Sequence, residues 1–275
     1  MRLFSKAVVF VVAMGLLTAG ALAQPLLYTG DTDGDTLHTL SLADGSATLV
    51  GSLGAPIIAG LAYDAGSDIL YGVDTGTNKL YSIDRTSGAA TEIGPFGGPT
   101  LMHGLAFDSQ TGTLYGAYGA SAADNLYTID TTTGAATFVG DIHHRDVIGL
   151  AFHPTTNVLY GVVFGYDYLP GDLLRISTTT GHGVVVAQTG DALTGLAFHP
   201  ATNVLYAVDN GAGDSPDALY TIDISTGATT LVGLTGLGNN LGLAFVPDAD
   251  VIPEPATLSL LTIGGLGLLR RRRRR

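Results

Sequence analysis

The sequence has 275 residues and contains neither cysteine nor tryptophan. Without cysteine, disulfide bonds, thiol chemistry and cysteine-ligated metals are excluded, so packing must hold the fold. Basic residues are also scarce: residues 24–250 carry 4 lysines and arginines against 23 acids, a formal net charge of −19. Nucleic-acid binding needs clustered lysine and arginine, so this charge argues against it. Calcium and cationic surfaces are the partners that such a charge favours, although it also serves solubility outside the cell.

The N-terminal segment has the parts of a secretory signal peptide. Arg2 and Lys6 precede an apolar run from Ala7 to Leu17, which is followed by Ala21-Leu22-Ala23. Small residues in this spacing are what signal peptidase cleaves. An uncleaved membrane anchor is the alternative, but the run is shorter than the roughly 20 apolar residues that span a bilayer. Residues 1–23 are therefore predicted to be removed by signal peptidase after Sec-dependent export.

The C-terminus carries a second targeting signal. Residues 251–255 read Val-Ile-Pro-Glu-Pro, residues 256–269 are mostly apolar, and residues 270–275 are all arginine. An apolar helix of 14 residues is about 21 Å long, so it only just reaches across a hydrocarbon core of about 30 Å. Arginines stay on the cytoplasmic side, which leaves the preceding domain outside. We therefore expect a short transmembrane helix that places the domain beyond the cytoplasm.

Pro253-Glu254-Pro255, followed by a short helix and an arginine cluster, resembles the PEP-CTERM sorting signal of Gram-negative bacteria. The resemblance implies that a membrane-embedded exosortase recognises and cleaves residues 251–275 near these three residues. The protein is then expected to be released or attached at the cell surface. The resemblance further implies an association with exopolysaccharide and biofilm matrix. A plain tail anchor is the alternative interpretation.

A block of about 45 residues recurs five times between Leu27 and Asp248. Each copy contains Gly-Leu-Ala followed by an aromatic residue, starting at Gly60, Gly104, Gly149, Gly195 and Gly242. Each copy also contains Leu-Tyr, starting at Leu27, Leu70, Leu114, Leu159 and Leu205. Two more apolar phrases complete the copy. Four short strands per repeat indicate one propeller blade, and the central region shows no helical periodicity.

The strand phrases resemble those of secreted NHL-like and lactonase-like propellers, in which Gly-Leu-Ala-Phe is the innermost strand. By that analogy, residues 24–250 begin on a second strand and end on the inner strand Gly242–Phe245. We therefore expect an all-β fold, a five-bladed β-propeller of four-stranded antiparallel blades. A 1+3 clasp between the N-terminal strands and the C-terminal inner strand would close the ring and leave no open edge. An incomplete ring that needs another chain is the alternative.

Repeated turns explain many polar residues. One turn family begins at Asp64, Asp108, His153 and His199. The two histidines therefore occupy a slot where other copies have aspartate, and we interpret them as turn residues. Another family ends in glycine at Gly88, Gly134, Gly181 and Gly227, where the turn requires positive φ. His103 and either His143 or His144 are the histidines expected near the channel, too few for catalytic zinc with three ligands.

Loops that differ between copies are where a specific ligand is expected. The longest span residues 118–125, 163–172 and 209–218, and the middle one contains Phe164, Tyr166, Asp167 and Tyr168. Aromatic rings beside a carboxylate suit a sugar ring, which offers a flat apolar face and polar edges. We predict a ligand site at these four residues, with Tyr118 as a further member. The competing interpretation is that the rings cap the blade.

Asp31, Asp33 and Asp35 form the densest acidic cluster. Their alternation suits Ca²⁺, which takes carboxylate and carbonyl oxygens. The segment departs from an EF-hand loop, because its glycine falls at position four and Leu42 stands at position twelve. The cluster aligns with Asp74-Thr-Gly-Thr-Asn78 of the next copy, so a polar hairpin turn is the competing interpretation. Calcium is the one cofactor that the sequence suggests.

The sequence thus predicts an exported surface or extracellular-matrix propeller that acts as a binding or structural module for exopolysaccharide, and favours this over an enzyme. The alternative is a propeller enzyme, a lactonase, lyase or glycosidase with a site in the central channel, with or without calcium. The inner-strand phrase contains neither the carboxylate pair of glycosidases nor a nucleophilic-serine elbow. Converging acids and imidazoles in the channel would favour the enzyme. Glycine and apolar side chains would favour a scaffold.

Overall fold

The computed structural model describes residues 24–54, 57–118, 124–165, 171–190, 192–210 and 217–246. All of them except Gln24 belong to the unit Pro25–Asp248. They form 20 β-strands and no helix. Within these ranges, accordingly, there is no helix with the length and apolar character to cross a membrane. The predicted signal peptide and the sorting segment lie outside the described residues.

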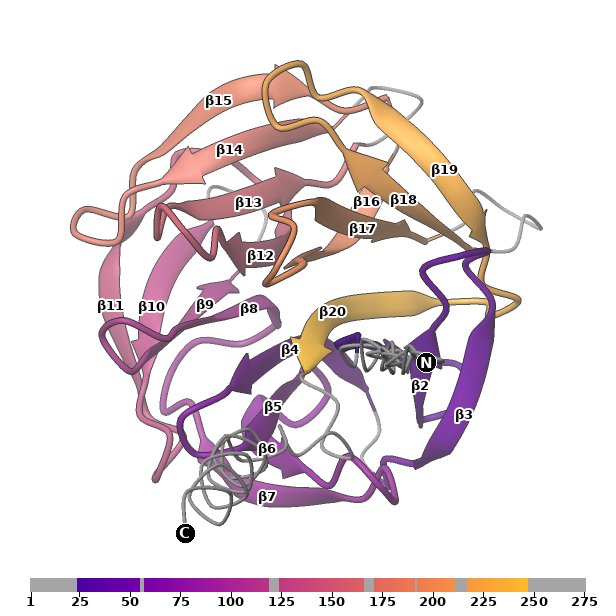
Figure 1. The fold of residues 1–275 in the computed structure, drawn as a ribbon. Helices are drawn as coiled ribbons and strands as arrows, with labels where there is room; N and C mark the ends of the chain where they lie inside the picture. Colours follow the sequence, from indigo (N-terminus) through magenta and orange to yellow (C-terminus); the bar gives the residue numbers. More distant parts are fainter. Residues whose placement is uncertain are drawn as a thin grey trace, which may run out of the picture. The chain divides into compact units, whose positions relative to one another are not determined.

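Five four-stranded antiparallel sheets form the blades of a propeller (Figure 1). Blade 1 contains β20 (Asn240–Val246), β1 (Leu26–Asp31), β2 (Thr36–Leu40) and β3 (Ala47–Ser52). Blade 2 contains β4 (Ile58–Asp64), β5 (Ile69–Asp74), β6 (Lys79–Ile83) and β7 (Ala90–Pro95). Blade 3 contains β8 (Met102–Asp108), β9 (Thr113–Tyr118), β10 (Asn125–Ile129) and β11 (Ala136–Asp141). Blade 4 contains β12 (Val147–Phe152), β13 (Leu159–Val163), β14 (Asp172–Ile176) and β15 (Gly183–Gln188), and blade 5 contains β16 (Leu193–Phe198), β17 (Leu205–Asp209), β18 (Ala218–Ile222) and β19 (Thr229–Leu234).

The ring closes through the predicted 1+3 clasp, which is confirmed. Strand β20 pairs with β1 in antiparallel register, with Phe245 opposite Leu27. Thr29 Oγ1 also donates to the carbonyl of Gly242 at 3.1 Å. In Figure 1 the C-terminal strand, in yellow, accordingly lies beside the indigo strands of the N-terminus. Neighbouring inner strands contact each other all the way round the ring, including β20 with β4, so the incomplete-ring alternative is wrong.

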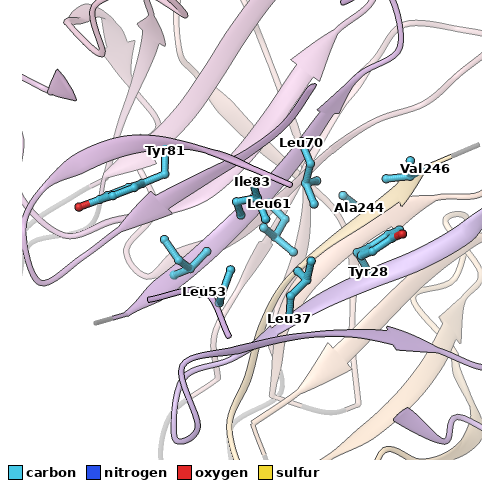
Figure 2. Close-up of a cluster of buried hydrophobic side chains, with 10 residues drawn as sticks. Tyr28, Leu37, Leu53, Leu61, Leu70, Tyr81, Ile83, Ala244 and Val246 are labelled. Atoms are coloured by element: carbon cyan, nitrogen blue, oxygen red, sulfur yellow. The ribbon is translucent and has the colours of Figure 1, made fainter. Parts of the chain in front are cut away.

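The hydrophobic core is divided among the gaps between blades. Between blades 1 and 2, for example, Tyr28, Leu37 and Val246 pack against Leu61 and Ile83 (Figure 2). Because each blade is covered on both faces, its strands are apolar without clean alternation. Each fully buried leucine contributes about 1.5–3 kcal/mol relative to exposure. The stability that disulfides cannot provide therefore comes from packing between consecutive repeats.

Glycine pairs let the outer strand of one blade touch the turn of the next blade. Gly140 in β11 faces Thr180 and Gly181, and a Cβ added at Gly140 would lie 1.8 Å from the Thr180 carbonyl oxygen. Gly181 has the predicted positive φ, +79°. The same close approach joins Gly233 of blade 5 to Gly45 of blade 1, so it includes the closing contact. These glycines are therefore required for both turn geometry and blade contact.

Candidate functional site

The central channel is closed at its middle by apolar side chains. Leucines of the five inner strands, Leu61, Leu105, Leu150, Leu196 and Leu243, are each 2% exposed. Together with Ile148, His103 and three glycines they surround a gap that leaves essentially no room for water. Among these described lining residues, His103 contributes the polar side chain. The described lining of this gap therefore consists of glycine and apolar side chains with one imidazole.

Of the histidines expected near the channel, His103 lies there, and His143 and His144 do not. His103 lies at the channel as expected, and its burial lowers its pKa while the charge of Asp146 opposes that shift. His143 does not face the axis: its ring is 5.1 Å from that of His182 in blade 4, and its Nδ1 lies 2.9 Å from Asp141 Oδ1. His144 lies against Gly183 at the start of β15. The expectation that His143 or His144 reaches the channel is thus wrong, because the linker turns both toward the next blade.

Beyond the leucines the channel widens into an open hollow of about 130 Å³, which we call the aromatic bowl. Its walls carry the aromatic residues that end the Gly-Leu-Ala phrases, Tyr63, Phe107, Phe152, Phe198 and Phe245, together with Pro154 and Pro200. Each of these rings stands two residues after a channel leucine, so leucine and ring share one face of the strand. The bowl therefore follows directly from the repeated phrase.

Second-strand tyrosines hold the rings of the bowl in place. Tyr160 of blade 4 packs on Phe198 of blade 5 with ring centroids 5.5 Å apart, and Tyr206 packs on Phe245 at the same distance. His153 lies 4.9 Å from Phe198 and accepts a backbone hydrogen bond from Thr155 through Nδ1 at 3.2 Å. The predicted turn role of His153 is confirmed. His199 does the same, through Nδ1 and the N–H of Ala201.

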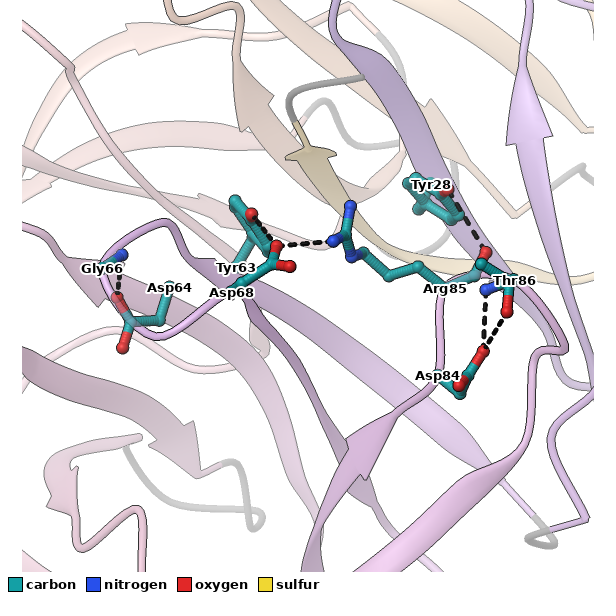
Figure 3. A network of polar contacts seen from close by, with 8 residues as sticks. All are labelled: Tyr28, Tyr63, Asp64, Gly66, Asp68, Asp84, Arg85 and Thr86. Carbon is teal, nitrogen blue, oxygen red and sulfur yellow. Dashed lines mark hydrogen bonds and ion pairs between the residues drawn. The ribbon is translucent and has the colours of Figure 1, made fainter. Parts of the chain in front are cut away.

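One ring of the bowl, Tyr63, belongs to a polar network with Asp68 and Arg85 (Figure 3). Tyr63 is the ring that bears a hydroxyl, and it donates to Asp68 Oδ1 at 2.5 Å. Arg85 Nη2 donates to the same oxygen at 2.5 Å, and its guanidinium lies 5.5 Å from the centre of the Tyr63 ring. Burial and the adjacent Asp68 raise the pKa of Tyr63 to about 12. The neutral tyrosine and the charged pair therefore form a fixed hydrogen-bonding edge beside an apolar surface.

The residues predicted for ligand binding lie in different blades. Tyr118 ends β9 and packs edge-on against Tyr127 of the same blade, with ring centroids 6.3 Å apart. Phe164 follows β13 of blade 4, where its N–H donates to the carbonyl of Asp146 at 2.8 Å. Tyr166, Asp167 and Tyr168 lie outside the described residues. The ring contact of Tyr118 resembles the blade-capping alternative, and the site as a whole stays a prediction.

The acidic cluster Asp31, Asp33 and Asp35 adopts a turn. Asp31 Oδ1 accepts from the N–H of Asp33 at 3.2 Å, and Asp35 has a φ of +47°. Asp33 also approaches the linker that precedes β20, where Asn239 Nδ2 lies 3.5 Å from its Oδ1. In the described part of the chain, no three acidic or histidine side chains converge closely enough to hold a metal by themselves. These contacts match the hairpin interpretation, and calcium binding by this trio stays a prediction.

Sequence reasoning did not single out two buried aspartates. We call the places where they lie joints: each joint is the connection between second and third strands together with the linker to the next inner strand. Asp124 Oδ2 accepts from the N–H of Val147 at 2.5 Å, and Asp217 Oδ2 accepts from the N–H of Asn240. Burial raises the pKa of each to about 6. The signal in the sequence was weak: a polar residue precedes the third strand at Asp35, Asn78, Asp124 and Asp217, but Gly171 breaks the pattern.

Residues 251–274 match the PEP-CTERM protein-sorting motif. The motif implies export beyond the cytoplasm, transient anchoring in the membrane and processing by an exosortase. No curated protein matches the chain.

Solved structures share the propeller fold. A chain from the nidogen/laminin complex is 14% identical with a TM-score of 0.58, covering 81% of this chain and 98% of that one. A gluconolactonase from Xanthomonas campestris is 16% identical with a TM-score of 0.51, covering 80% and 79%. At these identities the likeness shows the fold alone.

Proposed function

We propose that this exported, exosortase-sorted propeller is a binding module of the cell surface or extracellular matrix, with a sugar of the exopolysaccharide type as its ligand. The propeller extends over residues 24–250 once the signal peptide, residues 1–23, and the sorting segment, residues 251–275, are removed. The aromatic bowl with its polar edge is the observation that carries the proposal. A sugar ring has apolar C–H faces that stack on aromatic rings and hydroxyls that bond to charged side chains.

The dimensions of the bowl limit what it holds. Its volume of about 130 Å³ is below the roughly 300–1,000 Å³ of pockets that enclose drug-sized molecules. A single sugar ring, or the end of a chain, is therefore the expected occupant. Next to the Tyr63 ring, Asp68 and Arg85 carry an acceptor and a donor that are already fixed by their mutual hydrogen bond. The binding of one ring is expected to be weak, so matrix attachment would depend on many copies at the surface.

The loops of residues 118–125 and 163–172, which we call the upper loops, provide a second proposed contact with the same ligand class. Tyr118 and Phe164, together with Tyr166, Asp167 and Tyr168, retain the combination of aromatic rings and a carboxylate that suits a glycan. A long polysaccharide can engage both ends of the channel on different copies of the protein. The fold likeness to a gluconolactonase does not bring lactonase activity to this chain, because the likeness is limited to the fold.

A glycan array with residues 24–250 tests the proposal. We expect binding to a subset of bacterial exopolysaccharide fragments. Asp68→Asn and Tyr63→Phe, which leave the rings of the bowl in place, should weaken that binding several-fold. Lys79→Gln is the matched control, because Lys79 forms its ion pair with Glu92, at 2.8 Å, and not with the group of Tyr63, Asp68 and Arg85.

The outcomes separate the two contacts. Loss of binding in Asp68→Asn assigns the ligand to the bowl. Loss in a Tyr166→Ala, Tyr168→Ala double variant, with Asp68→Asn unaffected, assigns it to the upper loops instead. Binding to no glycan at millimolar concentration, by a protein that unfolds cooperatively, would contradict the proposed function.

A further inference from the structure

The joint between blades 5 and 1 contains Asp217 and the linker that leads into β20, and we call it the closing joint. It contains buried oxygen atoms without hydrogen-bond partners. In the described part of the chain, five buried side-chain polar atoms lack a partner, and three of them are Asp217 Oδ1, Asn239 Oδ1 and Asn240 Oδ1. Both Asp217 and Asn240 are 0% exposed. An unpartnered buried acceptor is unfavourable, because it has lost its hydrogen bonds to water. The three acceptors belong to residues that are consecutive or hydrogen-bonded to one another.

Hydrogen bonds hold these residues together. The N–H of Asn240 donates to Asp217 Oδ2, and Asn240 Nδ2 donates to Thr235 Oγ1 at 2.8 Å. Thr235 Oγ1 in turn donates to the carbonyl of Asp217 at 3.1 Å. This circuit joins the connection before β18 to the linker that leads into β20. The orientation of both side chains is thereby set before any ligand is bound.

Blade 1 adds negative charge to the same place. The N–H of Thr32 donates to the carbonyl of Asn239 at 3.2 Å, which brings the turn after β1 onto the linker. Asp33 lies close enough to Gly238 that a Cβ added there would be 3.0 Å from its Oδ2. The charges that act on Asp217 are those of Asp209, Asp31 and Asp33, and all three are negative. The closing joint therefore concentrates acidic charge around the unpartnered oxygens.

The equivalent joint between blades 3 and 4 satisfies its aspartate with backbone N–H groups. Asp124 occupies the position of Asp217 and accepts the N–H of Val147. There, however, burial raises the pKa of Asp124 while hydrogen bonds from the N–H groups of Val147 and Asp146 lower it, and the charges of Asp146 and Arg145 act on it with opposite signs. No atom of Asp124 is among the unpartnered ones of the described residues. The charges that act on Asp124 are thus of both signs, whereas those that act on Asp217 are all acidic.

We propose that the closing joint binds a calcium ion through Asp217 Oδ1 and the side-chain oxygens of Asn239 and Asn240, with Asp31 and Asp33 supplying further charge. Calcium accepts six to eight oxygen ligands in flexible geometry and takes amide carbonyls as well as carboxylates. This donor set contains only oxygen, and one of its carboxylates is buried. The ion connects the linker before β20 to the first hairpin of blade 1. It thereby stabilises the pairing of β20 with β1 that closes the ring. The site is independent of glycan binding and differs from the predicted hairpin trio.

Calorimetric and thermal titration of residues 24–250 with CaCl₂ at pH 7.5, after EDTA treatment, tests the site. The ring closes within these residues, so this chain contains the whole joint. Extracellular calcium modules bind with Kd on the order of 10⁻⁴–10⁻³ M. With such a Kd, 10 mM Ca²⁺ should raise the Tm by roughly 3–10 °C. Magnesium at the same concentration should have a smaller effect, because it demands a tighter octahedral geometry.

Matched variants locate the ion. Asp217→Asn preserves the shape of the side chain and should abolish the calcium-dependent rise in Tm, whereas Asp124→Asn at the equivalent joint should retain it. Should Asp217→Asn fail to fold, Asp33→Asn and Asn239→Ala at less buried positions should each weaken calcium binding at least several-fold. Absence of a calcium effect on the unmodified protein would overturn the proposal. A proton on Asp217 would then take the place of the calcium ion. A rise that persists in Asp217→Asn, or an equal rise with magnesium, would also overturn it.

Discussion

Aspartate residues in the peripheral turns of the propeller differ sharply from those in its joints. The peripheral turns join third to fourth strands, and in blade 3 Asp130 Oδ1 accepts from the N–H and the hydroxyl of Thr132 at 2.8 and 2.6 Å. These bonds lower the pKa of Asp130 to about 2. In the joints, Asp217 accepts the N–H of Asn240 and Asp124 accepts those of Val147 and Asp146, while burial raises the pKa of each aspartate to about 6. Solvent access, more than hydrogen bonding, therefore decides which charge state an aspartate favours in this protein.

The two groups should therefore respond to pH with opposite signs. For Asp124 and Asp217 the folded pKa is raised above the unfolded value, so their stabilising effect is complete below about pH 4 and is lost as pH rises through about 6. For Asp130 the folded pKa is lowered, so its effect is complete above about pH 4 and is lost as pH falls toward 2. Without calcium, we expect the stability of the propeller to increase on acidification from pH 7 to about 5.

The largest effect is expected where a peripheral turn meets the outer strand of the neighbouring blade. Gly140→Ala places a Cβ 1.8 Å from the Thr180 carbonyl oxygen, so backbone must move and overpacking should cost about 3 kcal/mol or more. Urea unfolding measures the change. Gly98→Ala is the control, because nothing lies within 4 Å of its added Cβ, and it should stay within about 0.5 kcal/mol of the unmodified protein. Similar midpoints for both variants would contradict the prediction, because they would show that the neighbouring blade moves away from the added Cβ at little cost.

A smaller effect of opposite sign is expected at the joints. In EDTA at pH 7.5, Asp217→Asn removes a buried charge while it keeps an acceptor for the N–H of Asn240, and should raise the free energy of unfolding by about 1–3 kcal/mol. Asp124→Asn should stabilise less, because the carboxylate of Asp124 accepts the N–H groups of both Val147 and Asp146, whereas an amide offers a single oxygen acceptor. Chemical unfolding between pH 4 and 7 should show a flatter profile for Asp217→Asn than for the unmodified protein. A steeper profile, or destabilisation at pH 7.5, would mean that Asp217 is ionised without cost.

The smallest effect is expected when a peripheral turn loses its own carboxylate. Asp130→Ala removes the acceptor for Thr132 and should lower stability at pH 7, because the exposed turn then has fewer hydrogen bonds. The difference from the unmodified protein should shrink between pH 4 and pH 2, the window in which the carboxylate of Asp130 takes up its proton. Denaturant midpoints at three pH values measure this. A difference that stays constant across the window would show that the side chain acts through shape and not through charge.

Much of the propeller was predictable because its signals are local and repeated. Gly-Leu-Ala-aromatic phrases located the inner strands, and the order of the phrases at the two ends predicted the clasp between β20 and β1. His153 and His199 were assigned to turns by comparison with Asp64 and Asp108. His143 was misplaced, because a linker between strands has no periodicity that fixes the direction of its side chains.

Residues 24–246 determine by their sequence alone the number of blades, the strand order and the turns, because each depends on contacts within one repeat or between neighbouring repeats. The tertiary structure decided what the repeats create together. The aromatic bowl exists because five rings from separate copies meet at one mouth of the channel. The closing joint exists because Asp217, Asn240 and the turn after β1 meet only when the ring closes, which brings residues more than 200 positions apart into hydrogen-bonding contact. Both sites depend on distances between blades, and the phrase of a single repeat does not record those distances.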